Sequence, residues 1–240
     1  VGAIRWDAWT GGGVTEQVER TLGPAKYHDR LPWFAEVVAE HTVRIQGGRQ
    51  EIMDREIGYA AQAGLDYWAF LLYPESSTMS ESLKLYLASA HRQRVKFCLI
   101  LHNAFGVAEA EWPGERDRTV ALLQEPGYQT VLGGRPLVYV FSLQYQGAFP
   151  TERFADFRRA AGAAGLDPYC VYMGWNPAGD FRDHAAKGFA AVSAYAHGSS
   201  HAQFSQLVQA VETRYWQAAA DAGGPCIPLV TTGRAKRPQV

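Results

Sequence analysis

Short runs of consecutive apolar residues alternate with longer amphipathic segments along most of the chain. Phe97–Leu101 is apolar at every position, as expected for a strand that is covered on both faces of a parallel sheet. After the first unit, the expected strands begin roughly 20 to 40 residues apart, with a helix-like segment in between. This rhythm predicts an α/β fold made of repeated βα units.

The expected elements follow from these patterns. Seven strands are predicted, at Ala3–Ala8, Tyr67–Leu72, Lys96–Leu101, Leu137–Phe141, Tyr169–Met173, Ala190–Ala194 and Ile227–Thr231. Helices are predicted at Arg49–Ala63, Thr151–Ala164 and Ala202–Ala222. A glycine follows each of these helices, which is a common helix end: Gly64, Gly165 and Gly223.

Two folds have this rhythm, a doubly wound sheet and a (β/α)8 TIM-type barrel. No glycine-rich phosphate turn follows the first strand, whereas polar and aromatic residues follow strand after strand, as at the mouth of a barrel. We therefore predict a TIM-type barrel as one domain over residues 1–240, in which residues 11–48 form an elaborated loop. Because the seventh strand begins only at Ile227, we expect the barrel to be truncated after that strand, with the C-terminal βα unit missing.

Composition excludes several classes of protein. A hydrophobic content of 47% with aromatics at 12% is typical of a folded core and not of a disordered chain. The net charge of −1 offers no attraction for a polyanion, so no nucleic acid partner is expected. No run of 18 apolar residues occurs, so no membrane span is expected. The thiols of Cys98, Cys170 and Cys226 form no CxxC pair and are expected to be buried, and the compartment stays open.

The residues that follow the expected strands are candidates for a binding site, because the C-terminal strand ends form the site of a barrel. Most of them are aromatic or neutral hydrogen-bonding groups. Sugars need this mixture, since their C–H faces stack on aromatic rings and their hydroxyls take polar partners. We predict that a carbohydrate substrate is bound by Asp7, Trp9, Tyr73, His102, Asn103, Trp175, Asn176, Tyr195, His197 and Arg234.

Some of these residues have a structural alternative. Asp7 could equally bond to Arg5, and Trp9 and Trp175 could pack under a loop. Two further tryptophans precede or lie within strands and are expected in the core: Trp6 and Trp68.

Glycosidases usually need two carboxylates, an acid and a nucleophile or base. Glu75 is the best candidate for proton transfer, with a simple loop charge as the alternative. His197 and His201 have the i,i+4 spacing that a metal could use, but no third ligand is evident, so neither a metal nor a cofactor is expected.

Three segments, in order, resemble the glycoside hydrolase family 99-like (WbsX-like) barrels. Asp54–Tyr73 resembles the first helix and second strand of that group, and Tyr128 with Gly133–Phe141 resembles its fourth strand. Pro228–Pro238 is similar to its seventh-strand segment. The resemblance implies a carbohydrate-active barrel, an endo-acting or related glycosidase.

The chain also departs from that group. Arg234-Ala235 stands where the group has Trp-Asp after the seventh-strand glycine, and the first strand reads Ile4–Trp9 where the group's strand runs into Tyr or Phe. The group's Glu-containing motif belongs to the eighth strand, beyond Val240. The resemblance therefore implies that the main catalytic carboxylates lie beyond Val240.

These observations favour a glycoside hydrolase that acts on a polysaccharide or glycan by carboxylate acid/base chemistry. The alternative is a non-catalytic glycan-binding barrel in a polysaccharide-processing system. A third reading is a metal-dependent hydrolase that uses His197 and His201.

Overall fold

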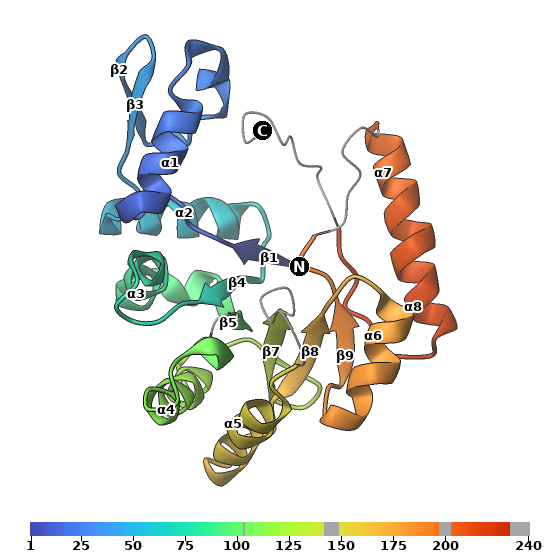
Figure 1. Cartoon of the computed structure of the whole chain (residues 1–240). Coiled ribbons are helices and arrows are strands. Elements are labelled where there is room, and N and C mark those ends of the chain that lie inside the picture. The colour runs from blue at the N-terminus through green and yellow to red at the C-terminus, as the bar shows by residue number, and fades with distance from the viewer. Residues whose placement is uncertain (103, 142–148, 197–202, 231–240) are drawn as a thin grey trace. The chain divides into compact units, whose positions relative to one another are not determined.

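The computed structural model describes residues 1–102, 104–141, 149–196 and 203–230. Its contacts divide the chain into two compact units, unit 1 over Val1–Lys96 and unit 2 over Phe97–Arg234. Figure 1 labels the helices and strands of both units.

Unit 1 is built around two parallel strands, β1 (Gly2–Arg5) and β4 (Tyr67–Leu72), paired from Gly2 opposite Tyr67 to Arg5 opposite Phe70. The helix before β4 is α2 (Gln50–Gln62), and α3 (Glu81–Ala88) follows the strand. The apolar side of α2 is buried, as its amphipathic pattern predicts: Ile52, Met53, Ile57 and Ala60. Short 3₁₀ helices complete the unit, at Ala25–Arg30, Thr78–Ser80 and Arg92–Arg94.

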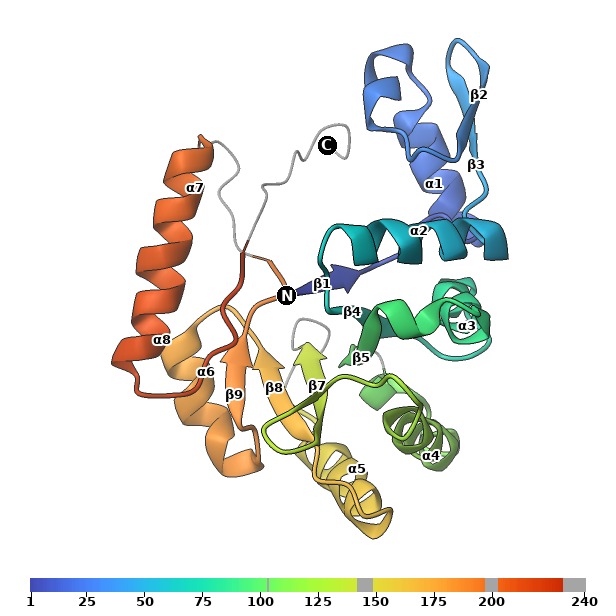
Figure 2. The same cartoon turned by 180° about the vertical axis from the view of Figure 1, so that it is seen from behind.

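The segment between β1 and α2 is not a loop, so that expectation is wrong. It contains α1 (Gly12–Leu22) and an antiparallel hairpin of β2 (Ala35–Ala39) and β3 (Thr42–Ile45). Val43 and Ile45 of β3 are buried, and α1 packs against that strand. Both views show α1 beside the hairpin (Figures 1 and 2). The hairpin forms because alternate β3 residues find an apolar surface on α1.

Unit 2 contains a parallel sheet in the order β5 (Lys96–Leu101), β7 (Arg135–Phe141), β8 (Tyr169–Met173) and β9 (Ala191–Ser193). A two-residue strand, β6 (Thr130–Val131), pairs antiparallel with β7. Every residue of β8 is buried, and so is every residue of β5 after Lys96. Burial on both faces explains why these strands are continuous apolar runs.

Among the described residues of unit 2, five helices accompany this sheet: α4 (Trp112–Leu123), α5 (Thr151–Ala163), α6 (Pro177–His184), α7 (Phe204–Val211) and α8 (Ala218–Asp221). A π-helical stretch, Glu212–Gln217, joins α7 to α8. The helix α6 packs against β8 and β9 on one side and against α8 on the other (Figure 2). Two 3₁₀ turns, at Ala104–Gly106 and Ala185–Lys187, complete the unit.

Three of the predicted strands have the bounds expected from the sequence: Tyr67–Leu72, Lys96–Leu101 and Tyr169–Met173. The glycines that follow the predicted helices have the left-handed backbone that ends a helix, with φ of 77° at Gly64, 76° at Gly165 and 69° at Gly223. The predicted alternation of helices and strands is therefore confirmed at these places.

The predicted strand at Ile227–Thr231 is not a strand over its described part. Cys226 forms an isolated parallel bridge with Val192, and the amide of Ile227 donates to the Val192 carbonyl at 3.0 Å. Pro225 and Pro228 flank this bridge and have no N–H to donate, so a longer ladder does not form there.

Parallel strands that alternate with helices are found in both units, which is the pattern of a (β/α) barrel, and the predicted fold class is confirmed. Cys98 and Cys170 are buried free thiols, and burial raises the pKa of both, that of Cys170 to about 12. Within the described ranges, no helix has the length and apolar character needed to cross a membrane.

Candidate functional site

Two aromatic side chains lie together where the strands of unit 1 end. Because β1 and β4 are parallel, their C-terminal ends lie at one edge of the unit. Trp6 follows β1 and donates from its indole Nε1 to the hydroxyl of Tyr73, which follows β4, at 2.9 Å. Burial raises the pKa of the Tyr73 hydroxyl, although the bond from Trp6 acts in the opposite direction.

Trp6 is 44% exposed, so its expected place in the core is wrong. The neighbouring Arg5 turns toward Trp68 and α2, and successive side chains of a strand point to opposite faces. Trp6 therefore faces away from α2 and presents an indole surface beside Tyr73. The alternation along β1 was a signal that could have placed it there.

Asp7 is buried and bound to Arg5. Both of its carboxylate oxygens accept from the Arg5 guanidinium at 2.9 Å. Arg5 also bonds to Glu56 of α2 and lies 4.3 Å above the ring centre of Trp68. These contacts favour the structural alternative for Asp7, and its contact with a substrate stays a prediction.

Trp9 and Glu75 differ in their surroundings. The Trp9 ring meets the edge of Phe34, and a Cβ on Gly47 would lie only 2.8 Å from Trp9 Cδ1.

Glu75 is exposed, and its main-chain oxygen accepts from Lys84 Nζ at 2.9 Å. Over the part of the chain that the structure describes, the Glu75 carboxylate has no hydrogen bond or ion pair. The catalytic role of Glu75 stays a prediction.

In unit 2, three aromatic rings from the ends of different strands form a stack. The His102 ring, after β5, stacks on Phe141 of β7 with centroids 5.6 Å apart and an interplanar angle of 19°. Phe141 stacks in turn on Tyr195, after β9, at 4.6 Å and 25°. Burial lowers the pKa of His102, so its imidazole is neutral near pH 7.

This stack brings together two predicted binding residues, His102 and Tyr195. Phe141, which joins them, was not among the candidates, because an apolar residue at the end of a strand is ordinarily a core residue. No signal in the sequence distinguished it.

The turn after β8 carries Trp175, Asn176 and Asp180. Trp175 is 45% exposed, as a residue that stacks on a ligand must be. Asn176 caps α6, since its side-chain oxygen accepts from the Gly179 amide at 3.3 Å. Binding of a substrate by Trp175 and Asn176 stays a prediction.

Asp180 lies in the first turn of α6, and its carboxylate lies back against the end of β8. A Cβ on Gly174 would be 2.1 Å from Asp180 Oδ2, and that oxygen accepts from the Asn176 amide at 2.9 Å. Burial raises the pKa of Asp180, although bonds from the Asn176 and Trp175 amides lower it in part. Asp180 is thus a second carboxyl group near a strand end.

Three predicted binding residues lie outside the described residues: Asn103, His197 and Arg234. His201 of the metal hypothesis lies outside them as well. Over the remaining, described residues, no group of three or more His, Cys, Asp or Glu side chains is arranged to hold a metal ion.

With this geometry established, the chain can be compared with known proteins. No protein-family model matches it, and no curated protein is similar to it. It is similar to a solved structure of the GH99 endo-alpha-mannosidase from Bacteroides thetaiotaomicron, with a TM-score of 0.51 and 16% identity over 75% of this chain. The same enzyme in complex with BIS-TRIS-propane gives a TM-score of 0.54 and 14% identity over 77% of this chain.

The chain has a GH99-like fold. It spans 52% of the length of the first of these structures and 57% of the second. At such low identity the likeness concerns the fold alone, and the activity has to be argued from the residues.

Proposed function

We propose that this chain is part of a glycoside hydrolase that cleaves a polysaccharide or glycan by carboxylate acid/base chemistry. The GH99-like fold supports this proposal, because both similar structures are of an endo-alpha-mannosidase. A mannose-containing glycan is accordingly the first substrate to test. We also propose that the chain is related to the WbsX-like barrels, on the three segments that resemble them, and that it forms one barrel domain that a further βα unit completes.

The observation that carries the proposal is the character of the strand ends. Trp6 and Trp175 expose indole surface of the kind that stacks on sugar rings. Tyr73, Tyr195 and His102 add hydroxyl and imidazole groups at the strand ends of their own units. A phosphorylated substrate would instead need a concentration of Lys and Arg at these positions.

In this proposal Glu75 moves a proton, and Asp180, at a strand end of unit 2, is a further carboxyl candidate. A carboxyl group with a raised pKa keeps its proton to a higher pH, which suits a general acid. Any further carboxylates of the eighth strand are expected from the resemblance to lie beyond Val240.

Activity of the natural full-length protein on mannans, glucans and galactans tests the proposal. General acid/base groups contribute about 100-fold or more to the rate, so Glu75→Gln should lower kcat by about that factor. Glu36→Gln removes an exposed carboxylate from β2 and is the matched control, which should keep full activity. An unchanged kcat in Glu75→Gln would show that Glu75 has no part in the mechanism. If the full-length protein cleaves none of these glycans, the proposed hydrolase activity is wrong.

The alternative is a glycan-binding barrel without catalysis. It is favoured by one observation, that Asp7 and Asp180 are both engaged by protein donors in the structure. This alternative predicts that the chain binds a mannan or glucan oligosaccharide in calorimetry, that Trp175→Ala weakens this binding, and that the full-length protein releases no product.

A further inference from the structure

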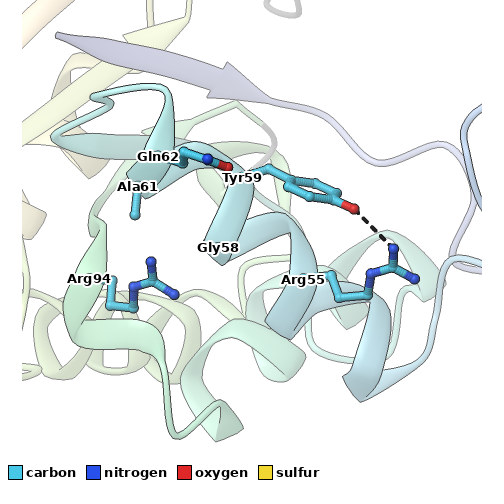
Figure 3. A pocket seen from close by; sticks show the side chains of 6 residues that line it. All are labelled: Arg55, Gly58, Tyr59, Ala61, Gln62 and Arg94. Carbon is cyan, nitrogen blue, oxygen red and sulfur yellow. Dashed lines mark hydrogen bonds between the residues drawn. The ribbon is translucent and has the colours of Figure 1, made fainter.

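A shallow depression of about 480 Å³ lies on the outer side of α2, away from the strand ends of unit 1. It is lined by Arg55, Gly58, Tyr59, Ala61 and Gln62 of α2 and by Arg94 of the 3₁₀ helix before β5 (Figure 3). We call it the α2 depression. The C-terminal end of α2 leads into the start of β4, so the depression lies toward the N-terminal ends of the strands.

The lining of the α2 depression contains two arginines and no carboxylate. The acidic groups of α2 are engaged elsewhere: Glu51 with Arg49, Asp54 with Ser89, and Glu56 with Arg5. In the described part of the chain, neither Arg55 nor Arg94 has an ion pair with a carboxylate. The depression therefore has an uncompensated positive charge, which attracts an anionic group.

Gly58 keeps the floor of the depression open. A Cβ at this position would already lie 3.7 Å from a terminal nitrogen of Arg94, so a larger side chain would occupy the space in front of that guanidinium. Glycine inside a helix costs about 1 kcal/mol relative to alanine. Figure 3 shows Gly58 between Arg94 and Arg55 in that view.

Tyr59 supplies a fixed aromatic wall. Arg55 donates to the Tyr59 hydroxyl at 3.0 Å, and the same guanidinium lies 4.2 Å above the Trp33 ring. Trp33 also meets the edge of Tyr59, yet 46% of Trp33 and 48% of Tyr59 remain exposed. A rigid, exposed ring next to a guanidinium suits a ligand that has both an apolar face and a carboxylate.

We propose that the α2 depression binds an acidic saccharide, with the sugar carboxylate on Arg94 above Gly58 and the sugar ring against Tyr59. A planar guanidinium pairs with a carboxylate through two parallel hydrogen bonds, so Arg94 is the group that selects an acidic sugar over a neutral one. The choice of a saccharide over another carboxylated ring rests on the proposed glycan function.

Calorimetry of the purified chain with trigalacturonate tests this site, with the fully methyl-esterified trimer as the matched neutral probe. The acid should bind about tenfold more tightly than the ester, since charged hydrogen bonds contribute about 1.5 kcal/mol or more. Arg94→Gln should weaken binding of the acid about tenfold, whereas Arg20→Gln, which removes an exposed arginine from α1, should leave it unchanged.

Gly58→Leu is a second variant that fills the floor without removing charge. Leucine favours a helix more than glycine does, so the variant should fold while binding of trigalacturonate is lost. Equal binding of acid and ester, or binding that survives both Arg94→Gln and Gly58→Leu, overturns the proposal. If the full-length protein cleaves glycans but trigalacturonate does not bind here, only the proposed binding site is wrong. If trigalacturonate binds here but no glycan is cleaved, only the proposed hydrolase activity is wrong.

Discussion

At the scale of single residues, Arg5 has partners in several segments of unit 1. Asp7 follows it in the chain, Glu56 comes from α2, and Trp68 from β4. Burial by itself would lower the pKa of Arg5, but the two carboxylates outweigh this effect and the pKa is raised. Arg5 therefore stays charged and joins β1 to the helix and strand that pack on it.

Removing this guanidinium should destabilise the chain. Arg5→Met leaves the Asp7 carboxylate, whose side chain is only 6% exposed, without its cation. An uncompensated buried charge of this kind costs about 3 kcal/mol, which urea unfolding followed by circular dichroism can measure. The double variant Arg5→Met, Asp7→Asn should recover part of the loss. A loss below about 1 kcal/mol in Arg5→Met would show that the ion pair does not stabilise the unit.

The sequence alone leaves the role of Asp7 open. Two roles were predicted for Asp7, a sugar ligand or a partner of Arg5, and both predictions rested on its position beside β1. Glu56 stands 51 positions from Arg5, and its bond to the guanidinium depends on the packing of α2. Local sequence could suggest Arg5 as a partner of Asp7, but only the packed helix showed how Arg5 is held.

At the scale of elements, the turn from β8 to α6 depends on Gly174. The Asp180 carboxylate returns from α6 and occupies the space that a Cβ on Gly174 would need. Asn176 caps the same helix, so the turn is held from both of its ends. Trp175 lies within this turn and is exposed.

Gly174→Ala should displace Asp180 and destabilise the chain by about 1–3 kcal/mol, as overpacking of a filled site does. Gly162→Ala in α5 is the matched control, because no atom lies within 4 Å of the Cβ it would add. That control should be neutral or should stabilise the chain by about 0.5–1 kcal/mol. Thermal unfolding of the two variants compares them directly, and equal midpoints would contradict the contact between Gly174 and Asp180.

Elements with complete burial were predicted best. The strands β4, β5 and β8 have apolar residues on both faces, and a short apolar run of this kind is typical of a buried strand in a parallel sheet. The hairpin β2–β3 was missed because only one of its faces is covered, and Val37 and Val38 are exposed. Its stability depends on α1, and that contact is not visible in the local pattern.

At the scale of the whole molecule, stability should depend on pH through two buried histidines of unit 2. Burial, together with the charge of the nearby Lys187, lowers the pKa of His184 to about 4. Lys187 Nζ lies 3.3 Å from His184 Nδ1, which suits a neutral ring. The pKa of His102 is lowered by burial in the same direction.

The sign of the effect follows from the protons bound. Between the ordinary pKa of 6.5 and about 4, the unfolded chain holds a proton on His184 that the folded chain does not. Stability is therefore full above pH 6.5 and falls as the pH is lowered toward 4, by on the order of 2 kcal/mol. Urea unfolding at several pH values measures this loss.

His184→Phe is the variant that isolates this contribution. Phenylalanine can keep the stack on Tyr172, whose ring centre is 3.8 Å from that of His184, but it cannot take up a proton. The variant should lose clearly less stability than the natural chain over the same pH range. An identical pH profile in both proteins would show that His184 does not titrate in this way.

The sequence by itself determined the alternation of strands and helices, the fully buried strands and several helix ends. The strands and helices follow from the local periodicity of apolar residues, and the helix ends follow from the glycines behind them. Only the tertiary structure decided which side chains meet: Trp6 with Tyr73, and His102 with Phe141 and Tyr195. Those groups come from strands far apart in the chain. Their contacts depend on the register of parallel strands and on the packing of helices. Neither can be predicted from a local sequence pattern.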